Sequence, residues 1–150
     1  MRSESLKMSP NKRFDFQEHT ADERVIAYGS TLEEAFENAA LALFEVMTDT
    51  QTIDMVIHDS FQIEGFDEHA LLYSWLETFI VEFDVNLKVY SKFHVNITKT
   101  DEQYHLLGQA WGETFQPTKH PSRSEVKAIT YHEMEITKNQ HVTLKFILDL

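Results

Sequence analysis

Cysteine is absent from this 150-residue sequence, which excludes disulfide bonds, thiolate metal sites and a cysteine nucleophile. Glycine and proline are scarce, with four and three residues, and no repeat or low-complexity tract is present. The sequence has no run of eighteen apolar residues, and it does not have the charged segment followed by an apolar stretch that is typical of a secretion signal. We therefore expect a cytoplasmic protein without a secretion signal or a membrane span.

Basic side chains are also few, since 13 Lys and Arg stand against 25 Asp and Glu, for a net charge of −12. A protein this acidic is repelled by phosphate backbones, so we expect no direct, tight nucleic-acid binding. The charge would steer the protein toward a basic partner or a cation. Solvation of the surface alone also explains an acidic composition, and both interpretations stay open.

The motifs of several enzyme classes are missing. The sequence contains no Gly-rich loop that would cradle a phosphate and no Gly-x-Ser-x-Gly nucleophile elbow. Its eight histidines do not occur at zinc-binding spacings. Nucleotide-binding, serine hydrolase and zinc hydrolase functions therefore lose their usual support.

The apolar pattern predicts an α+β fold. Residues 1–13 are expected to form a flexible tail, and residues 14–150 a single domain. Apolar positions at helical spacing predict two amphipathic helices over 32–47 and 67–83, begun by Ser30 or Thr31 and by Asp67. Alternating patterns predict strands over 12–18, 24–28, 53–64, 87–98, 103–114, 126–136 and 141–150. We expect a mostly antiparallel sheet, or sheets, with both helices packed on one face.

The turn Glu18-His19-Thr20-Ala21-Asp22 joins the first two predicted strands without glycine or proline. Thr20 and Asp22 are residue types that hydrogen-bond local backbone, so the turn can be held by its own side chains. This leaves an imidazole and a carboxylate at the edge of the sheet. From this segment alone, a purely structural, self-capped turn is the simpler explanation.

A second carboxylate, Asp149, interrupts the apolar pattern of the last predicted strand. If strand pairing brings it beside Asp22, two carboxylates, backbone carbonyls and the α-carboxylate of Leu150 converge. Oxygen-only ligation suits calcium or magnesium rather than zinc. Two like charges also favour a nearby lysine such as Lys127. This lysine belongs to a locally basic segment. A solvated loop without a binding role is the alternative explanation for that segment.

A set of short motifs follows one another along the chain: His19-Thr20-Ala21-Asp22, Ala27-Tyr28-Gly29, 31–36, 71–76, Gly112-Glu113, Lys119-His120, 125–132 and Leu148-Asp149-Leu150. Together, these motifs resemble those of the archease family from about residue 14 to residue 150. Two residues depart from the family's pattern: Glu23, and Glu133, which replaces a glycine that is common before the methionine of its strand.

The resemblance implies a non-enzymatic role. Archeases are small protein cofactors of RtcB-type RNA ligases in tRNA splicing and RNA repair. They promote guanylylation of the ligase from GTP and sustain its multiple turnover, so the nucleotide is bound by the ligase. The family's calcium or magnesium site maps onto Asp22, Asp149 and the backbone of Leu150. Lys127 matches a functional lysine, and His19 and His120 lie in motifs close to it.

Two other functions remain as alternatives. A general chaperone-like or scaffold protein would bind basic partners through the acidic surface, with salt-sensitive affinity and no special need for the carboxylate pair. An enzyme would use His19 or His120 with Asp22 as acid and base, although the sequence offers no legible nucleophile. Turnover of a small phosphoester without any ligase would support that last interpretation.

Overall fold

The computed structural model of the protein describes residues 12–18 and 21–150. Most of the predicted tail, together with His19 and Thr20, therefore lies outside the described residues. The described elements confirm the α+β class. In chain order they are β1 (Phe14–Glu18), β2 (Asp22–Gly29), α1 (Leu32–Met47), the short 3₁₀ helix η2 (Thr50–Thr52), β3 (Ile57–Gly65), α2 (Glu68–Asn86), β4 (Lys88–Thr100), β5 (Gln103–Thr114), β6 (Ala128–Lys138) and β7 (Val142–Asp149).

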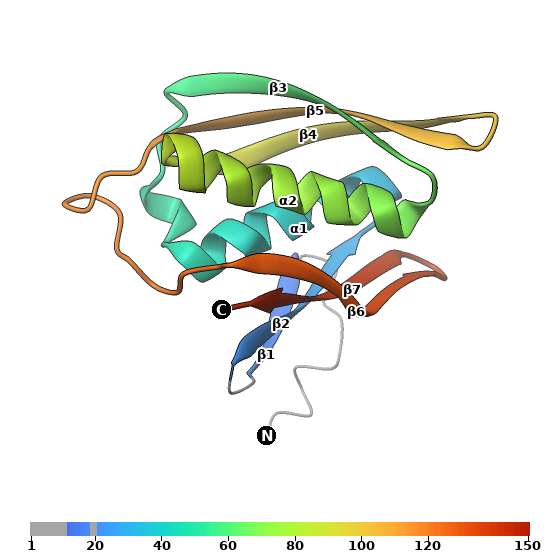
Figure 1. The fold of residues 1–150 in the computed structure, drawn as a ribbon, viewed down its shortest axis with the longest axis horizontal. Coiled ribbons are helices and arrows are strands. Elements are labelled where there is room, and N and C mark those ends of the chain that lie inside the picture. Colours follow the sequence, from blue (N-terminus) through green and yellow to red (C-terminus); the bar gives the residue numbers. More distant parts are fainter. Residues whose placement is uncertain (1–11, 19–20) are drawn as a thin grey trace.

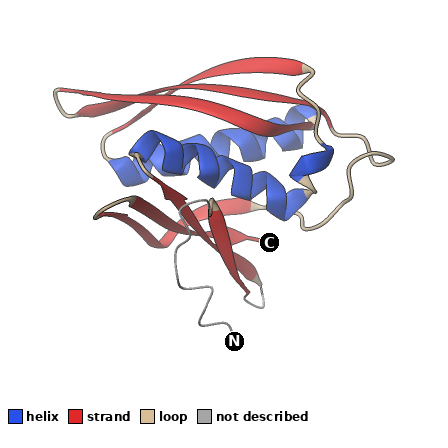
Figure 2. Cartoon of the chain, turned by 180° about the vertical axis from the view of Figure 1, so that it is seen from behind, coloured by secondary structure: helices blue, strands red, loops and turns tan. Residues whose placement is uncertain are grey.

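The described strands form two antiparallel sheets with both helices between them (Figure 2). The four-stranded sheet has the order β1-β2-β7-β6, and the three-stranded sheet has the order β3-β5-β4. Each sheet turns one face toward the helices, which is why the strands alternate between buried and exposed residues. The last strand, β7, lies in the middle of the larger sheet and places the C-terminal residues beside β2 (Figure 1).

Both helices begin at predicted capping residues. Thr31 accepts a hydrogen bond from the Glu34 N–H at 3.1 Å, and the Glu34 carboxylate accepts one from the Ser30 N–H at 2.6 Å. Asp67 caps α2 by accepting from the Ala70 N–H at 2.7 Å. These side chains satisfy backbone donors that a helix start leaves without partners, and so they fix where each helix begins.

Within the core, aromatic side chains join both helices to the smaller sheet. Trp75 is fully buried, and its indole N–H donates to the carbonyl of Phe36 at 2.9 Å, which ties α2 to α1. Phe79 meets the Trp75 ring edge-on at 4.6 Å between centroids. A Cβ at Gly108 would lie 2.5 Å from the Trp75 ring, so glycine is needed there for the sheet to approach α2.

The two largest differences between predicted and observed element boundaries lie at the start of the third strand and at the end of the second helix. The third strand begins at Ile57 rather than at residue 53, and the residues just before 53 form η2, which Asp49 caps. The Asp54 N–H instead donates to the Glu113 carboxylate, outside the strand ladder. Helix α2 continues to Asn86, three residues beyond its predicted end, and Leu87 closes it in the left-handed conformation with φ 56°.

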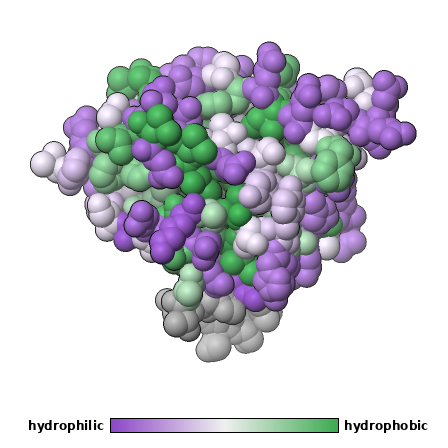
Figure 3. All heavy atoms as spheres, viewed as in Figure 1, coloured by the Kyte–Doolittle hydropathy of each residue, from purple (hydrophilic) through white to green (hydrophobic). Residues whose placement is uncertain are grey.

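The face shown in Figure 3 is largely hydrophilic, with an apolar area over the C-terminal half of α2. Val81 and Val85 of this helix and Leu87, which follows it, are exposed apolar residues, and Val85 is 71% exposed. None of the described helices has the length and apolarity needed to span a bilayer.

Candidate functional site

The two predicted carboxylates face each other across neighbouring strands. Asp22 begins β2, Asp149 ends β7, and the antiparallel register pairs them directly. Directly opposite residues project from the same face of a sheet, with their Cβ atoms about 5 Å apart. Asp22 is half-buried and Asp149 is exposed. The structure therefore brings together the two residues whose convergence the sequence left conditional.

Backbone hydrogen bonds draw two further segments to this carboxylate pair. The Leu150 N–H donates to the Ala21 carbonyl at 3.3 Å, which holds the backbone of Leu150 next to Asp22. The Lys127 N–H donates to the Asp149 carbonyl at 2.7 Å, just before Ala128 pairs with Asp149 on the other side. Lys127 is exposed. Three predicted residues from the C-terminal half thus meet Asp22 at one end of the larger sheet.

The chemistry of this donor set fits a hard divalent cation. Two carboxylates and adjacent backbone oxygens are the ligands that calcium and magnesium prefer, and the pair carries two like charges at close range. Over the described ranges 12–18 and 21–150, no group of three or more His, Asp or Glu is arranged to hold a metal. A cation at this pair would need further ligands from backbone oxygens, water or a partner's oxygen atoms.

Arg24 introduces a positive charge on the same face. It lies two residues after Asp22 in β2, a spacing that returns to the same side of a strand. Its guanidinium forms an ion pair with Glu133 of β6. The hydrogen bond to Glu133 raises the pKa of Arg24, and the charge of Asp22 acts in the same direction. The carboxylate pair and the Arg24–Glu133 ion pair are therefore neighbours in one electrostatic cluster.

Glu133 occupies an irregular part of β6. The register with β7 shifts between Thr130 and Glu135, and Glu133 has a φ of 57°. This left-handed conformation is easy for glycine and costly for most other residues. Glycine, which the family resemblance predicts at this position, would adopt this conformation without strain.

His120 lies in a buried network away from the carboxylate pair. One Glu113 oxygen accepts hydrogen bonds from the Asp54 N–H at 2.8 Å, from Lys119 Nζ at 2.8 Å and from His120 Nε2 at 2.9 Å. His120 Nδ1 accepts from the Gln116 N–H at 2.9 Å, so the imidazole proton belongs on Nε2. Burial disfavours ionisation of Glu113, but these hydrogen bonds outweigh it and lower its pKa to about 2.

The network gives His120 a structural role in the segment between β5 and β6. The imidazole is fully buried, and the segment runs from the smaller sheet to the larger one (Figure 1). Two of its three Lys and Arg side chains pair with carboxylates, Lys119 with Asp54 and Glu113, and Arg123 with Glu45. In the described part of the chain, Lys127 makes no ion pair. His19 lies outside the described residues.

Sequence reasoning did not assign four of these residues to a site: Arg24, Glu133, Glu113 and Asp54. The period of two along a strand could have placed Arg24 on the face of Asp22. Glu113 appeared only within a family motif. No sequence signal could have shown that Glu133 meets Arg24 or that Asp54 meets Glu113, because each contact depends on tertiary packing.

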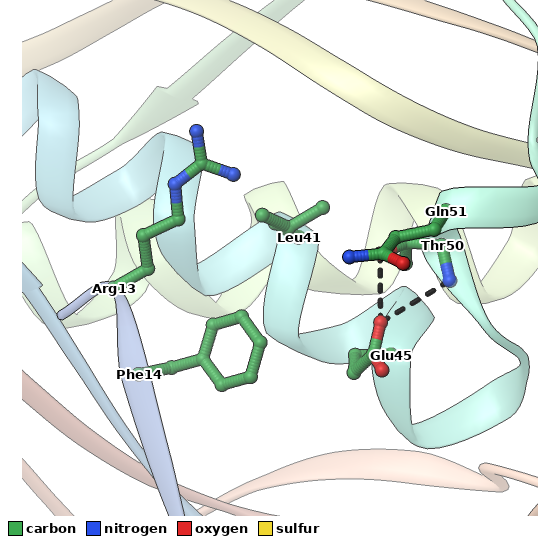
Figure 4. Close-up of a pocket in the computed structure, with 6 residues that line it drawn as sticks. All are labelled: Arg13, Phe14, Leu41, Glu45, Thr50 and Gln51. Atoms are coloured by element: carbon green, nitrogen blue, oxygen red, sulfur yellow. Dashed lines mark hydrogen bonds between the residues drawn. The ribbon is translucent and has the colours of Figure 1, made fainter. Parts of the chain in front are cut away.

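An open hollow lies elsewhere, between β1 and α1 (Figure 4). It encloses about 320 Å³ and is lined by Arg13, Phe14, Leu41, Glu45, Thr50 and Gln51. The Glu45 carboxylate is already engaged by the Thr50 hydroxyl at 2.7 Å and by Arg123. Because its one carboxylate is committed to structural contacts, we do not assign a ligand to this hollow.

The chain is similar to known proteins over most of its length. The model of the Archease protein family (MTH1598/TM1083) matches residues 14–150. The chain is 47% identical to the Protein archease of Sulfurisphaera tokodaii over 140 residues, covering 93% of this chain and 99% of that protein. It is 44% identical to the Protein archease of Pyrococcus furiosus, covering 85% and 89% of the two chains.

A solved structure agrees with these sequence matches. The solution structure of Methanobacterium thermoautotrophicum protein 1598 aligns with a TM-score of 0.82 and 43% identity, covering 91% of this chain and 98% of that one. The family match also spans both segments that form the carboxylate pair, the start of β2 and the end of β7. The chain therefore belongs to the archease family.

Proposed function

We propose that this chain is a protein activator of an RtcB-type RNA ligase, and that it promotes GTP-dependent guanylylation and multiple turnover of that ligase in tRNA splicing or RNA repair. The observation that supports this proposal is the direct pairing of Asp22 with Asp149 at one end of the larger sheet. Family membership supports an accessory role for the chain, and the carboxylate pair supplies a specific place where such a role can be exerted.

In this proposal Asp22 and Asp149 hold a calcium or magnesium ion together with the backbone of Leu150. Such an ion supplies positive charge that neutralises phosphate oxygens. The residues of the chain set its position. The register of β2 and β7 fixes the two carboxylates, and the hydrogen bond from the Lys127 N–H to Asp149 anchors the strand end. Lys127 then presents an exposed cation to the ligase.

The charge and the sequence of the chain indicate that RNA and GTP are bound by the ligase rather than by this chain. A chain with a net charge of −12 is poorly suited to hold RNA, and it has no Gly-rich phosphate loop for GTP. Both substrates are therefore assigned to the ligase. We propose His19 and His120 as supporting residues, with His120 acting through the buried network that holds the segment before Lys127. A cytoplasmic location stays our expectation.

The test is the rate of ligase guanylylation from GTP in the presence of a cognate ligase. We expect the wild-type chain to accelerate it, and Asp22→Asn and Asp149→Asn to lose most of that acceleration while unfolding cooperatively. Glu102→Gln is the matched control, because Glu102 is an exposed carboxylate in the β4–β5 turn. Full acceleration by both Asp variants would contradict the proposal.

The same assay distinguishes the proposed ligase activator from the scaffold alternative. A scaffold acting through overall negative charge would lose activity in all three variants equally and only slightly, because each changes the net charge by one. Its effect would also fall steeply with salt. Activation lost in the two Asp variants alone would support a localised site.

A further inference from the structure

The smaller sheet has one long edge strand that the rest of the described chain leaves open. β3 forms this edge and pairs with β5 in a register that runs without interruption from Ile57 to Gly65. Figures 1 and 2 both show β3 along the outer margin of the sheet, with no further described helix or strand beyond it. Over residues 12–18 and 21–150, no hydrogen bond from outside β5 reaches its backbone. The backbone groups on its outer side are therefore available to another strand.

The other edges of the two described sheets are protected. At the outer edge of β4, the Glu37 carboxylate of α1 accepts a hydrogen bond from the Val95 N–H at 2.9 Å. β6 is interrupted by the register shift around Glu133, and β1 has only five residues. Short, capped or irregular edges resist pairing with another chain, whereas a long regular edge is a template for it. Only the edge at β3 combines length, regularity and open backbone groups within the described sheets.

The sequence of β3 is complementary to itself in an antiparallel arrangement. With Phe61 placed opposite Phe61 of a second copy, His58 lies opposite Glu64 of that copy, and Ser60 lies opposite its Gln62. A two-fold axis repeats each contact, so two imidazole–carboxylate pairs and two hydrogen-bonding polar pairs form together. Complementary side chains in directly opposed positions stabilise paired strands, and like charges destabilise them.

These four polar side chains are exposed on the outer face of the sheet, where two of them have contacts within the chain. His58 stacks on the Trp111 ring at 4.8 Å between centroids, and its Nε2 lies 3.2 Å from the Gln109 amide oxygen. The Glu64 carboxylate has two neighbours on β5, each at 3.4 Å: Gln103 Nε2 and His105 Nδ1. Such long contacts between exposed groups contribute little, so a second strand can replace them with contacts of its own.

The inner face of β3 offers apolar surface to a second copy. Ile57 and Phe61 pack against the core and stay partly exposed at the edge of the sheet. Asp59 is the charged residue of β3 on this face, and it accepts hydrogen bonds from the Tyr90 hydroxyl at 2.6 Å and from Lys88 Nζ at 3.1 Å. An inward-pointing charge usually protects an edge, but this one is already neutralised by its own chain.

We propose that β3 is a self-association edge, at which two copies of the chain pair antiparallel about Phe61 and join their smaller sheets into one continuous sheet. Each copy contributes a single strand, so the contact lies at the small end of protein–protein interfaces. The dimer is therefore weak and depends on protein concentration. The carboxylate pair formed by Asp22 and Asp149 belongs to the other sheet, and the association requires neither a cation nor the ligase.

Sedimentation equilibrium of the purified chain tests the association. From about 5 to about 500 μM, the wild-type mass should rise from that of a monomer toward that of a dimer. His58→Glu sets carboxylate against carboxylate on both sides of the axis, so it should weaken the dimer about tenfold. Adding Glu64→Lys to His58→Glu makes both pairs attractive and should restore the dimer. Thr98→Glu is the matched control, because it adds a carboxylate at an exposed position of β4, and it should leave the dimer unchanged. Thermal unfolding verifies that each variant is folded.

Disulfide trapping tests the register, since the chain has no cysteine of its own. A mixture of His58→Cys and Glu64→Cys should give a disulfide-linked dimer, because the two positions are directly opposed in the proposed pairing. Either variant alone should give little of this dimer, because identical positions are then about 20 Å apart along the paired strands.

Four results would overturn the proposal. The first is a wild-type mass that stays monomeric up to about 500 μM. The second is a dimer that His58→Glu leaves intact or that the double substitution fails to restore. The third is disulfide trapping that is no stronger in the mixture than in the single variants. The fourth is protection of the β3 amides from hydrogen exchange only when an RNA ligase is added, which would assign this edge to a different protein.

Discussion

The buried Glu113 network allows a quantitative prediction about the segment that leads to Lys127. One Glu113 oxygen accepts three hydrogen bonds, from Asp54, Lys119 and His120. Glu113→Gln keeps the shape and one oxygen acceptor but removes the charge that strengthens these bonds. The substitution therefore measures the contribution of the charge alone.

The size of the effect follows from the lowered pKa. A fall from 4.5 to about 2 corresponds to about 3 kcal/mol between the two protonation states of Glu113. Lys119 is 35% exposed, so solvent screening reduces the expected contribution to about 1–2 kcal/mol. Because the folded pKa lies below the unfolded value, this stability is fully present above pH 4.5 and is lost as the pH falls through about 2.

Urea unfolding followed by tryptophan fluorescence at several pH values provides the assay. Glu113→Gln should be less stable than the wild type by about 1–2 kcal/mol at pH 7, and by less than half of that at pH 3. The difference between the two proteins isolates Glu113 from the other acidic residues, and Glu102→Gln serves as the control. A difference that stays constant from pH 7 to pH 3, or no difference at pH 7, would refute the reasoning.

Three further substitutions test the packing and the backbone. Gly112→Ala should destabilise the fold by at least about 3 kcal/mol, measured by urea unfolding, because its Cβ would lie 1.9 Å from the Val89 carbonyl; a loss below about 1 kcal/mol would contradict this close approach. Glu133→Gly should be more stable than Glu133→Ala by about 1 kcal/mol in thermal unfolding, because only glycine adopts a positive φ without strain; the reverse order would contradict the left-handed backbone. Trp75→Phe should cost about 2–4 kcal/mol in the same assay, because it leaves a void and removes the hydrogen bond to Phe36; a neutral effect would contradict the tight core.

Local signals predicted the helices well. Thr31 and Asp67 begin the two helices because capping and apolar spacing depend on residues close together in the chain. The predicted start of β3 was wrong by four residues. The side chains of Asp49 and Glu113 accept hydrogen bonds from backbone N–H groups in this region, so these residues do not pair as a strand before residue 57. An alternating pattern alone cannot reveal such competing partners.

The site depended more strongly on long-range pairing. Asp22 and Asp149 are 127 positions apart, and only the register of β2 with β7 brings them together. From the sequence alone, the convergence of these carboxylates could be stated only as a condition on strand pairing. The family resemblance then pointed to both residues as parts of one site. The burial of His120 and the contact between Arg24 and Glu133 were missed, because they depend on how a loop and an irregular strand fold back over the sheet.

The most direct test of the central claim is multiple-turnover RNA ligation by a cognate ligase, with the chain present at a small fraction of the ligase concentration. The account predicts that the wild-type chain sustains repeated guanylylation, that Asp149→Asn does not, and that Glu102→Gln behaves like the wild type. Full turnover with Asp149→Asn would contradict the claim that the carboxylate pair carries the function, and no stimulation by the wild-type chain would contradict the activator role itself.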